Sequence, residues 1–222
     1  ASDVYKRQGM ACLDVIMRLV RPGECVIAGD DLYGGSNRLL ELLKKQMHIE
    51  VDNIDTTDLV AVEQALQQRA KAHAAGEGAR VALVLLESPT NPMIKIADLA
   101  GCTRLVRKYI PEALVVVDNT MLSPYLMRPL EFGVDIVYHS ATKYLSGHHD
   151  IMAGVISCNR DDLAESMFFT IKSVGNALSP HDCFLLLRGV KTLALRMDRQ
   201  QTSAMQVDTY LERLGFKVRY LS

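Results

Sequence analysis

The sequence lacks the features typical of nucleic-acid-binding and membrane-spanning proteins. Its 25 lysines and arginines balance 26 aspartates and glutamates, so the formal net charge is −1. A balanced surface without a basic stripe gives no general attraction to nucleic acid or to an anionic membrane. No run of apolar residues approaches the length needed to cross a bilayer. We therefore expect neither a nucleic-acid partner nor a membrane partner.

Cysteine is scarce, and its distribution argues against two common uses of this residue. The odd number and wide spacing of the five cysteines do not suit a disulfide framework, and no pair has zinc-ligand spacing. His148-His149-Asp150 has no further ligand at metal-site spacing, so we expect no metal site. Reduced thiols predict a cytoplasmic protein, with import into an organelle as the alternative. The cysteines are Cys12, Cys25, Cys102, Cys158 and Cys183.

The first eight residues differ in character from the rest of the chain. Residues 2–8, Ser-Asp-Val-Tyr-Lys-Arg-Gln, show no hydrophobic period, and an apolar helical pattern begins abruptly at Gly9. The heptapeptide reads as the in-frame translation of a transposon adapter used in sequencing libraries. We therefore expect residues 1–8 to be non-native and the chain to be truncated at both ends. Genomic reads that cross the junction between Gln8 and Gly9 would refute this expectation.

From residue 9 onward, apolar strands alternate with amphipathic helices, and no internal repeat interrupts the alternation. The unbroken apolar run over 81–86 is typical of a strand that is covered on both faces. This order predicts an α/β domain with a mostly parallel sheet covered by helices. Strands are expected near 25–28, 49–51, 81–86, 114–117, 135–139, 153–157 and 216–221, and helices near 9–20, 37–47, 57–70, 98–109, 129–132, 161–172 and 180–214.

Several finer features of the helices are also predicted. Ser36 and Thr57 precede helical patterns and are expected to cap them, because a hydroxyl can accept a free N–H of the first turn. Arg196 and Arg199 are expected to lie on a solvated helix face.

Polar side chains follow four of the predicted strands. Tyr33, Asn91, Asp118 and Lys143 each stand at or just beyond a strand's carboxyl end. In parallel sheets ligands bind outside these ends, so we expect the four to converge. Taken singly, each has an ordinary structural explanation: turn packing for the tyrosine, an Asx turn for the asparagine, a helix cap for the aspartate and a solvated loop for the lysine.

Lys143 follows an apolar strand and stands among the hydroxyls of Ser140 and Thr142. A lysine in this position suits a Schiff-base site, because a sheltered pocket lowers the pKa of its amine. The neighbouring hydroxyls can bind a phosphate group. The sequence therefore predicts that Lys143 lies in a sheltered pocket beside a phosphate site.

Five segments together resemble the Cys/Met-metabolism pyridoxal-phosphate (PLP) enzymes. The resemblance covers residues 9–222 and implies fold type I, the aspartate-aminotransferase-like fold. It implies a PLP-binding major domain over 9–206 and the start of a truncated C-terminal domain over 207–222. It also implies small sulfur amino-acid substrates and a homodimer-based tetramer with active sites at the subunit interface. The segments are Gly9-Met10, Asp31-Leu32-Tyr33-Gly34-Gly35, Glu87-Ser88-Pro89-Thr90-Asn91-Pro92, Val117-Asp118-Asn119-Thr120 and Ser140-Ala141-Thr142-Lys143-Tyr144.

The resemblance assigns a role to each matching position. Lys143 corresponds to the catalytic lysine that holds PLP as a Schiff base and later moves the proton at the substrate Cα. Asp118 corresponds to the carboxylate on the pyridine nitrogen, and Tyr33 to the tyrosine that stacks on the ring and supports catalysis. Asn91 corresponds to the residue near the phenolic oxygen and the substrate carboxylate. The phosphate is expected against Gly9, Met10, Ser140 and Thr142.

The resemblance is closest to enzymes that cleave cystathionine by β-elimination to homocysteine, pyruvate and ammonia. The γ-synthase and γ-lyase reactions of the same family are the alternatives. An alternative from another class is a non-catalytic nucleotide-binding module, although no Gly-x-Gly-x-x-Gly follows any predicted strand. No residue here is assigned as the arginine for the substrate carboxylate or as the neighbouring subunit's phosphate ligands. We therefore expect the chain alone to bind PLP weakly and to turn over slowly.

Overall fold

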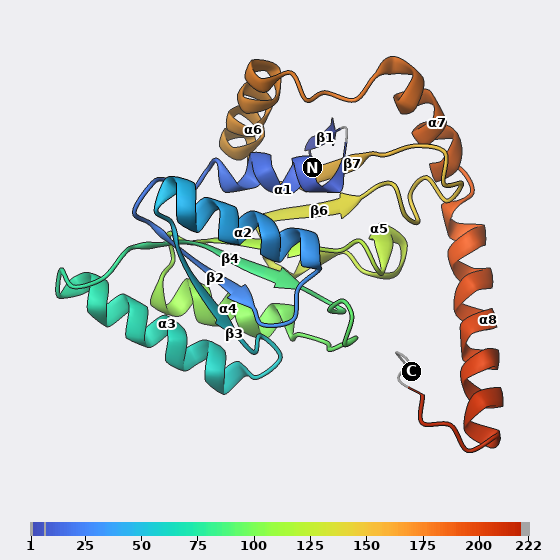
Figure 1. The fold of residues 1–222 in the computed structure, drawn as a ribbon, viewed down its shortest axis with the longest axis horizontal. Helices are drawn as coiled ribbons and strands as arrows, with labels where there is room; N and C mark the ends of the chain where they lie inside the picture. The colour runs from blue at the N-terminus through green and yellow to red at the C-terminus, as the bar shows by residue number, and fades with distance from the viewer. Residues whose placement is uncertain (1, 7, 219–222) are drawn as a thin grey trace.

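A seven-stranded sheet forms the centre of the computed structural model, which describes residues 2–6 and 8–218 (Figure 1). The strand order is β1-β7-β6-β5-β4-β2-β3. The strands are β1 (Ser2–Lys6), β2 (Cys25–Gly29), β3 (Glu50–Ile54), β4 (Val81–Glu87), β5 (Leu114–Asp118), β6 (Ile136–Ser140) and β7 (Gly154–Cys158). The helices are α1 (Gly9–Met17), α2 (Gly34–Met47), α3 (Leu59–Ala74), α4 (Leu99–Tyr109), α5 (Ser123–Leu126), the 3-10 helix η1 (Pro129–Phe132), α6 (Asp161–Val174), α7 (Pro180–Val190) and α8 (Leu193–Arg213).

The sheet is mostly parallel, as the alternation of strands and helices predicted. The strands from β3 through β2, β4 and β5 to β6 all run in one direction, whereas β7 is antiparallel to β6. β1 pairs antiparallel with β7, and no strand was predicted at this position. Its pairing does not test where residues 1–8 come from, and their non-native origin stays a prediction.

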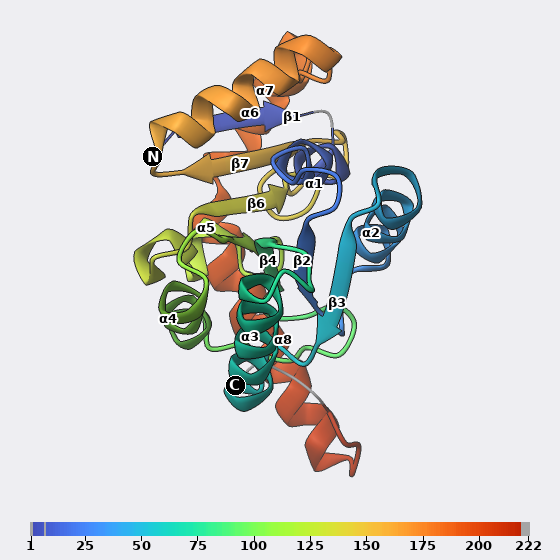
Figure 2. The same ribbon diagram turned by 90° about the vertical axis from the view of Figure 1, so that its left-hand side faces the viewer.

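Helices cover both faces of the sheet (Figure 2). On one face, α1, α2 and α6 pack against the strands and contribute buried side chains such as Ile16, Leu40 and Met167. On the other face, α3 and α4 contribute Leu66 and Val106. Because both faces are covered, the central strands β4 and β5 are apolar up to their last residue, as the run in β4 indicated.

Side chains alternate between the two faces along each central strand. In β4, Leu83 and Leu85 belong to the core under α1 and α2, whereas Val84 and Leu86 belong to the opposite core. In β5, Val116 lies in the core under α1 and α2. Continuing this alternation places the last residues of both strands on the side of α1 and α2.

Two helix caps differ from the sequence prediction. Ser36 lies inside α2, whose N-cap is Tyr33, and it is buried. Asp58 caps α3, with its side chain accepting the N–H of Val60, while Thr57 instead donates its N–H and hydroxyl to Asp55. The prediction of Thr57 as the cap was wrong, because its hydroxyl donates to Asp55 and the neighbouring carboxylate of Asp58 accepts the N–H of the first turn.

The helix expected over 180–214 is interrupted. α7 ends at Val190 and α8 begins at Leu193, and the N–H of Thr192 donates to the carbonyl of Gly189 in a tighter turn. Arg196, expected on a solvated face, instead turns back and donates to that same carbonyl, whereas Arg199 is exposed. An extra side-chain donor on this carbonyl, together with the hydroxyl of Thr192, explains the break.

After this break, α8 runs away from the sheet (Figure 1), and only its first turns contribute buried residues, Leu193 and Met197. The expected domain boundary after residue 206 falls inside α8 and stays a prediction. Residues 216–218 are not in a strand, and the rest of the strand expected over 216–221 lies outside the described residues.

Candidate functional site

The four polar residues that follow strands in the sequence lie along one edge of the sheet. β2, β4, β5 and β6 are parallel and lie side by side in the sheet, so their carboxyl ends share that edge. Tyr33, Asn91, Asp118 and Lys143 follow or end these strands in turn. The predicted convergence at the strand ends is therefore present, and the roles of the four residues stay predictions.

Asp118 occupies the centre of this edge, as the last residue of β5. Its Oδ1 accepts the N–H of Thr120 at 2.9 Å, and the side chains of Thr120 and Tyr138 also donate to it. Burial raises the pKa of the Asp118 carboxyl above its ordinary value, because the charged form loses solvation, and these hydrogen bonds oppose the rise. The carboxylate is thus held in one place by donors from two neighbouring segments.

Glu87 lies next to Asp118, and the sequence reasoning missed it. The two residues are paired in register at the ends of β4 and β5, and Glu87 is only 7% exposed. Its Oε2 accepts the N–H of Tyr33 at 2.8 Å, and its carboxyl also accepts the backbone N–H of Asn91. Glu87 therefore connects the two loops that carry Tyr33 and Asn91. Its position as the polar end of an apolar strand, like that of Asp118, was the signal that could have identified it.

The environment of Glu87 strongly favours the neutral acid. Burial and the neighbouring negative charge of Asp118 raise the pKa of Glu87 to about 8, against the lowering effect of the hydrogen bonds from Tyr33 and Asn91. Two adjacent buried carboxyls cannot both be charged at low cost.

Tyr138 completes a row with Glu87 and Asp118 across three strands. It pairs in register with Asp118, is 3% exposed, and its hydroxyl donates to the Asp118 carboxylate. Burial and the two carboxyls raise the pKa of Tyr138 well above its ordinary value, so the phenol remains a donor. The hydroxyl of Ser36 in α2 bonds to Tyr138 in turn. This residue also escaped the sequence reasoning, which took it as part of an apolar strand.

The side chains of Tyr33 and Met10 come together over Gly35. A Cβ on Gly35 would lie 2.5 Å from Cε1 of Tyr33 and 2.8 Å from Sδ of Met10, so a larger residue there would displace these side chains. The ring of Tyr33 is 50% exposed and remains available to stack on a planar ligand.

Gly9 and Ser140 are in direct contact, although 131 positions separate them in the sequence. A Cβ on Gly9 would lie 2.8 Å from Cβ of Ser140, so the amino end of α1 approaches the end of β6 closely. Ala11 and Cys12 donate their N–H groups to the carbonyl of Gln8. The N–H groups of Gly9 and Met10 lie before the first of these hydrogen bonds, at the position where the amides of a helix start have no acceptor inside the helix. Such amides can bind an anion.

Lys143 stands on a compact turn that follows β6. Its N–H donates to the carbonyl of Ser140, and its own carbonyl accepts the N–H of Gly147. The side chain of Lys143 is exposed. The described part of the chain therefore does not provide the expected shelter for its amine.

Thr142 fastens the lysine turn to the start of β7. Its Oγ1 accepts the N–H of Ala153 at 3.0 Å, and its own N–H donates to the Ala153 carbonyl at 3.2 Å. The hydroxyl of Thr142 thus already has a backbone partner. Of the two hydroxyls predicted to bind a phosphate, the hydroxyl of Ser140 is the one that lies beside the start of α1.

Asn91 is exposed in the loop after β4. The neighbouring Thr90 closes this loop, since its N–H donates to the carbonyl of Lys95 and its Oγ1 accepts the N–H of Lys95. The backbone of Asn91 is held by Glu87, as described above, so its side chain projects from a fixed loop.

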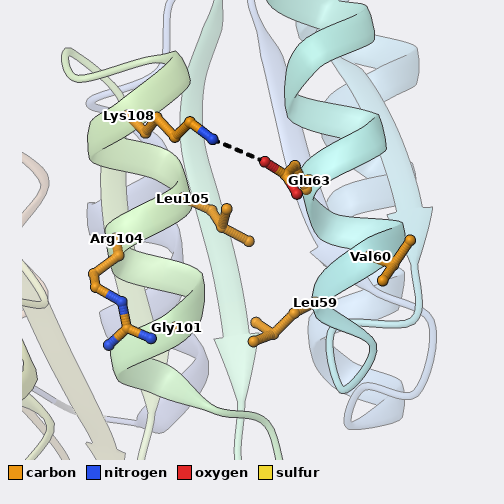
Figure 3. A pocket seen from close by; sticks show the side chains of 7 residues that line it. All are labelled: Leu59, Val60, Glu63, Gly101, Arg104, Leu105 and Lys108. Atoms are coloured by element: carbon orange, nitrogen blue, oxygen red, sulfur yellow. Dashed lines mark hydrogen bonds and ion pairs between the residues drawn. The ribbon is translucent and has the colours of Figure 1, made fainter.

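A separate cavity of about 410 Å³ lies between α3 and α4 (Figure 3). The polar groups at its upper end are paired with each other, since Lys108 Nζ lies 3.0 Å from Glu63 Oε1. Tyr109 also donates to this glutamate. The cavity contains none of the residues at the strand ends, so it is not the candidate site. Its lining is Leu59, Val60, Glu63, Gly101, Arg104, Leu105 and Lys108.

Three general features bear on the kind of site. Across residues 2–6 and 8–218, no group of three His, Cys, Asp or Glu side chains is placed to hold a metal ion. No helix in that part is long and apolar enough to cross a membrane. Within the part of the chain that the structure describes, none of the five cysteines forms a disulfide.

Comparison with known proteins places this geometry in context. Residues 3–221 match the model of the family described as Cys/Met metabolism PLP-dependent enzyme. The chain is 53% identical over 212 residues to a cystathionine beta-lyase of Neurospora crassa, covering 96% of the chain and 44% of that protein. It is 49% identical to a cystathionine beta-lyase of Schizosaccharomyces pombe, covering 96% of the chain and 52% of that protein. The chain thus spans about half the length of these relatives.

A solved structure confirms the fold expected from the resemblance. The crystal structure of cystathionine gamma-lyase from Lactobacillus plantarum, complexed with L-serine, superposes on the chain with a TM-score of 0.87. Sequence identity is 35%, and the match covers 96% of this chain and 52% of that chain. The major-domain fold of fold type I PLP enzymes therefore accounts for the strand order and the helical layers described above.

Proposed function

Because the chain belongs to the family of Cys/Met metabolism PLP-dependent enzymes, we propose that the protein is a carbon–sulfur lyase that uses PLP. Its proposed reaction is cleavage of cystathionine to homocysteine, pyruvate and ammonia. The observation that carries the proposal is the placement of a partly buried carboxyl, an amine and a helix start along one sheet edge. The names of the relatives with 53% and 49% identity support this reaction over the other reactions of the family.

The residues at this edge fit the chemical groups of PLP. The cofactor has a pyridine nitrogen, an aldehyde and a phosphate, which require a carboxylate, an amine and an anion site respectively. Asp118 supplies the first and Lys143 the second, while Gly9, Met10 and Ser140 supply the third. When bound, PLP provides an electron sink for the charge that develops at the substrate Cα. No such arrangement is expected of a nucleotide-binding module.

Asp118 is proposed to hold the pyridine nitrogen in its protonated form. Its carboxyl is partly buried and fixed by donors from Thr120 and Tyr138, so it can face a cationic N–H without reorganising. A charge-assisted hydrogen bond in a buried position is stronger than one in water. Tyr138 contributes as a neutral donor whose own ionisation is suppressed by burial.

Lys143 and Tyr33 are proposed as the catalytic residues. The amine of Lys143 holds the cofactor and then moves the proton at the substrate Cα, since it is exposed on a turn at the strand edge. The ring of Tyr33 stacks on the cofactor, and Asn91 lies near the substrate carboxylate. Glu87 fixes the backbones of Tyr33 and Asn91 at once.

The proposed assembly is a homodimer-based tetramer with active sites at subunit interfaces. The exposure of Lys143 supports this, because a neighbouring subunit can supply the shelter that an activated amine needs. Large exposed apolar side chains on the helices after β7 also support association, and size measurement in solution tests it. They include Phe168, Phe169, Phe184, Leu187 and Leu195. Cysteines that form no disulfide in the described part of the chain support a reducing compartment, and we propose the cytoplasm.

The reaction is tested by assaying the full-length gene product with cystathionine and PLP. Release of pyruvate supports β-elimination, and its loss in Lys143→Ala locates the chemistry. Release of 2-oxobutyrate and cysteine would instead identify γ-elimination, the alternative favoured by the similarity to the gamma-lyase structure. Formation of cystathionine from an activated homoserine and cysteine would identify the γ-synthase reaction. Absence of all three products with the cofactor attached would refute the proposal.

A further inference from the structure

Arg196, in the first turn of α8, reaches back to the turn that carries Lys143. Its Nη1 donates to the carbonyl of Tyr144 at 2.7 Å, and its Nη2 lies 3.4 Å from the carbonyl of Leu145. The same Nη2 donates to the carbonyl of Gly189 at 2.9 Å. One guanidinium therefore joins the lysine turn to the junction of α7 and α8.

The lysine turn needs such a donor. Within it, Ser146 donates to the carbonyl of Ala141 and Gly147 donates to the carbonyl of Lys143. The carbonyls of the next two residues, Tyr144 and Leu145, lie beyond the last of these hydrogen bonds. Like the last carbonyls of a helix, they need donors from outside the turn. A planar guanidinium with several fixed donors can satisfy both, and a cation suits this end of a helical turn.

Two glycines allow the approach. Gly147 adopts a positive φ of 71°, and a Cβ there would collide with the guanidinium of Arg196. On the other side of the junction, a Cβ on Gly189 would collide with the carbonyl oxygen of Ser146. The turn and the helical junction are thus packed backbone against backbone, with Arg196 between them.

The charge of Arg196 has no carboxylate partner among the described residues. Its donors go to backbone carbonyls and to Oγ1 of Thr192 at 3.0 Å. Burial lowers the pKa of Arg196 from its ordinary value, since the charge loses solvation without gaining an ion pair. Hydrogen bonds to the backbone therefore take the place of an ion pair for this partly buried cation.

We propose that Arg196 is a positioning residue, which fixes the direction of the Lys143 amine by tying its turn to the start of α8. This inference rests on the proposed function, because it takes Lys143 as the attachment point of the cofactor. It extends that function by making the placement of α8 part of the catalytic geometry. Movement of α8 then alters the reach of Lys143 without any contact between the helix and the substrate.

The test compares Arg196→Met with a matched control, Arg107→Met, in the full-length gene product. Arg107 in α4 also donates to backbone carbonyls, those of Ala113 and Gly133, and it pairs with Asp135. It lies on the opposite face of the sheet from α1, so its loss affects stability only. The measured quantity is the rate at which PLP attaches to Lys143, followed by the absorbance of the lysine-bound cofactor.

We expect Arg196→Met to slow attachment about 10- to 100-fold, because small displacements of a reacting group have effects of that size. Arg107→Met should leave the rate within about twofold of the unmodified protein, since it does not touch the reacting group. Added guanidinium ion, at concentrations that do not unfold the protein, should partly restore attachment in Arg196→Ala. If Arg196→Met does not fold, the smaller change Arg196→Lys gives the same comparison with an intermediate rate.

A second readout works without cofactor. Acetylation of Lys143 by limiting acetic anhydride is measured by mass spectrometry relative to Lys172, an exposed lysine on α6. The ratio should change in the Arg196 variants and not in Arg107→Met. Equal attachment rates and equal ratios in the two methionine variants would overturn the inference. Failure of the unmodified protein to attach PLP would instead refute the proposed function, while the acetylation ratio would still test the role of Arg196.

Discussion

Glu87 offers a direct test of the electrostatics at the strand ends, through the substitution Glu87→Gln. The side chain is 7% exposed and lies beside Asp118, and the pKa of its carboxyl rises from 4.5 to about 8. Between these two pH values the folded protein retains a proton that the unfolded chain has released. Stability from this group is therefore complete below pH 4.5 and is lost as the pH rises through about 8.

The size of the effect follows from the shift. Each pH unit in this range changes the free energy of unfolding by about 1.4 kcal/mol, so the full interval amounts to roughly 5 kcal/mol as an upper bound. Glutamine resembles the neutral acid in shape and cannot ionise. We therefore expect Glu87→Gln to match the unmodified protein within about 1 kcal/mol near pH 5, where the neutral acid and the amide differ only in a hydroxyl replaced by an amino group. At pH 8.5 the variant should be the more stable protein by several kcal/mol.

The assay is urea unfolding of the cofactor-free protein at intervals from pH 5 to 8.5. Glu63→Gln serves as control, because hydrogen bonds from Tyr109 and Lys108 lower the pKa of Glu63. Stability from Glu63 is present above its unfolded pKa and is lost only as the pH falls through its folded pKa, so this variant should add no slope between pH 5 and 8.5. A constant difference between Glu87→Gln and the unmodified protein across that range would refute the reasoning.

Four further substitutions test other parts of the structure. Asp118→Asn should reduce pyruvate release about 100-fold or more, because the amide cannot supply the charge that a protonated pyridine nitrogen requires; circular dichroism checks that the fold persists. Gly9→Ala should weaken PLP binding, measured by titration, because the added Cβ would lie 2.8 Å from Cβ of Ser140. Asp58→Ala should cost about 1 kcal/mol of unfolding free energy and Thr57→Ala less, as only Asp58 caps α3.

The order of strands and helices was predictable because burial leaves a local mark on the sequence. A strand covered on both faces is apolar throughout, as β4 is, and an amphipathic helix such as α4 repeats its apolar residues at the helical period. Once the strands are located, the chain order shows which residues stand at their carboxyl ends. This placed Asp118 and Lys143 correctly on the edge of the sheet.

The contacts of Glu87 and Arg196 left no such mark. Glu87 bonds to Tyr33, which is 54 positions away, and Arg196 bonds to Tyr144, which is 52 positions away. Hydrophobic periodicity shows which face of an element is buried, but it does not show which polar group from another segment meets that face. The break between α7 and α8 has the same origin, because the carbonyl that ends α7 is bound by a side chain from the next helix.

The row formed by Glu87, Asp118 and Tyr138 also connects ionisation to cofactor binding. The negative charge of Asp118 is one of the causes that raise the pKa of Glu87. A protonated pyridine nitrogen on Asp118 would neutralise that charge, so the pKa of Glu87 should fall on binding and a proton should be released. PLP affinity should therefore rise with pH more steeply in the unmodified protein than in Glu87→Gln. Lys143 and the cofactor also ionise, but they contribute equally to the pH dependence in both proteins, so their contribution cancels in the difference. Identical pH dependence of PLP affinity in both proteins would show that Asp118 and Glu87 are not coupled.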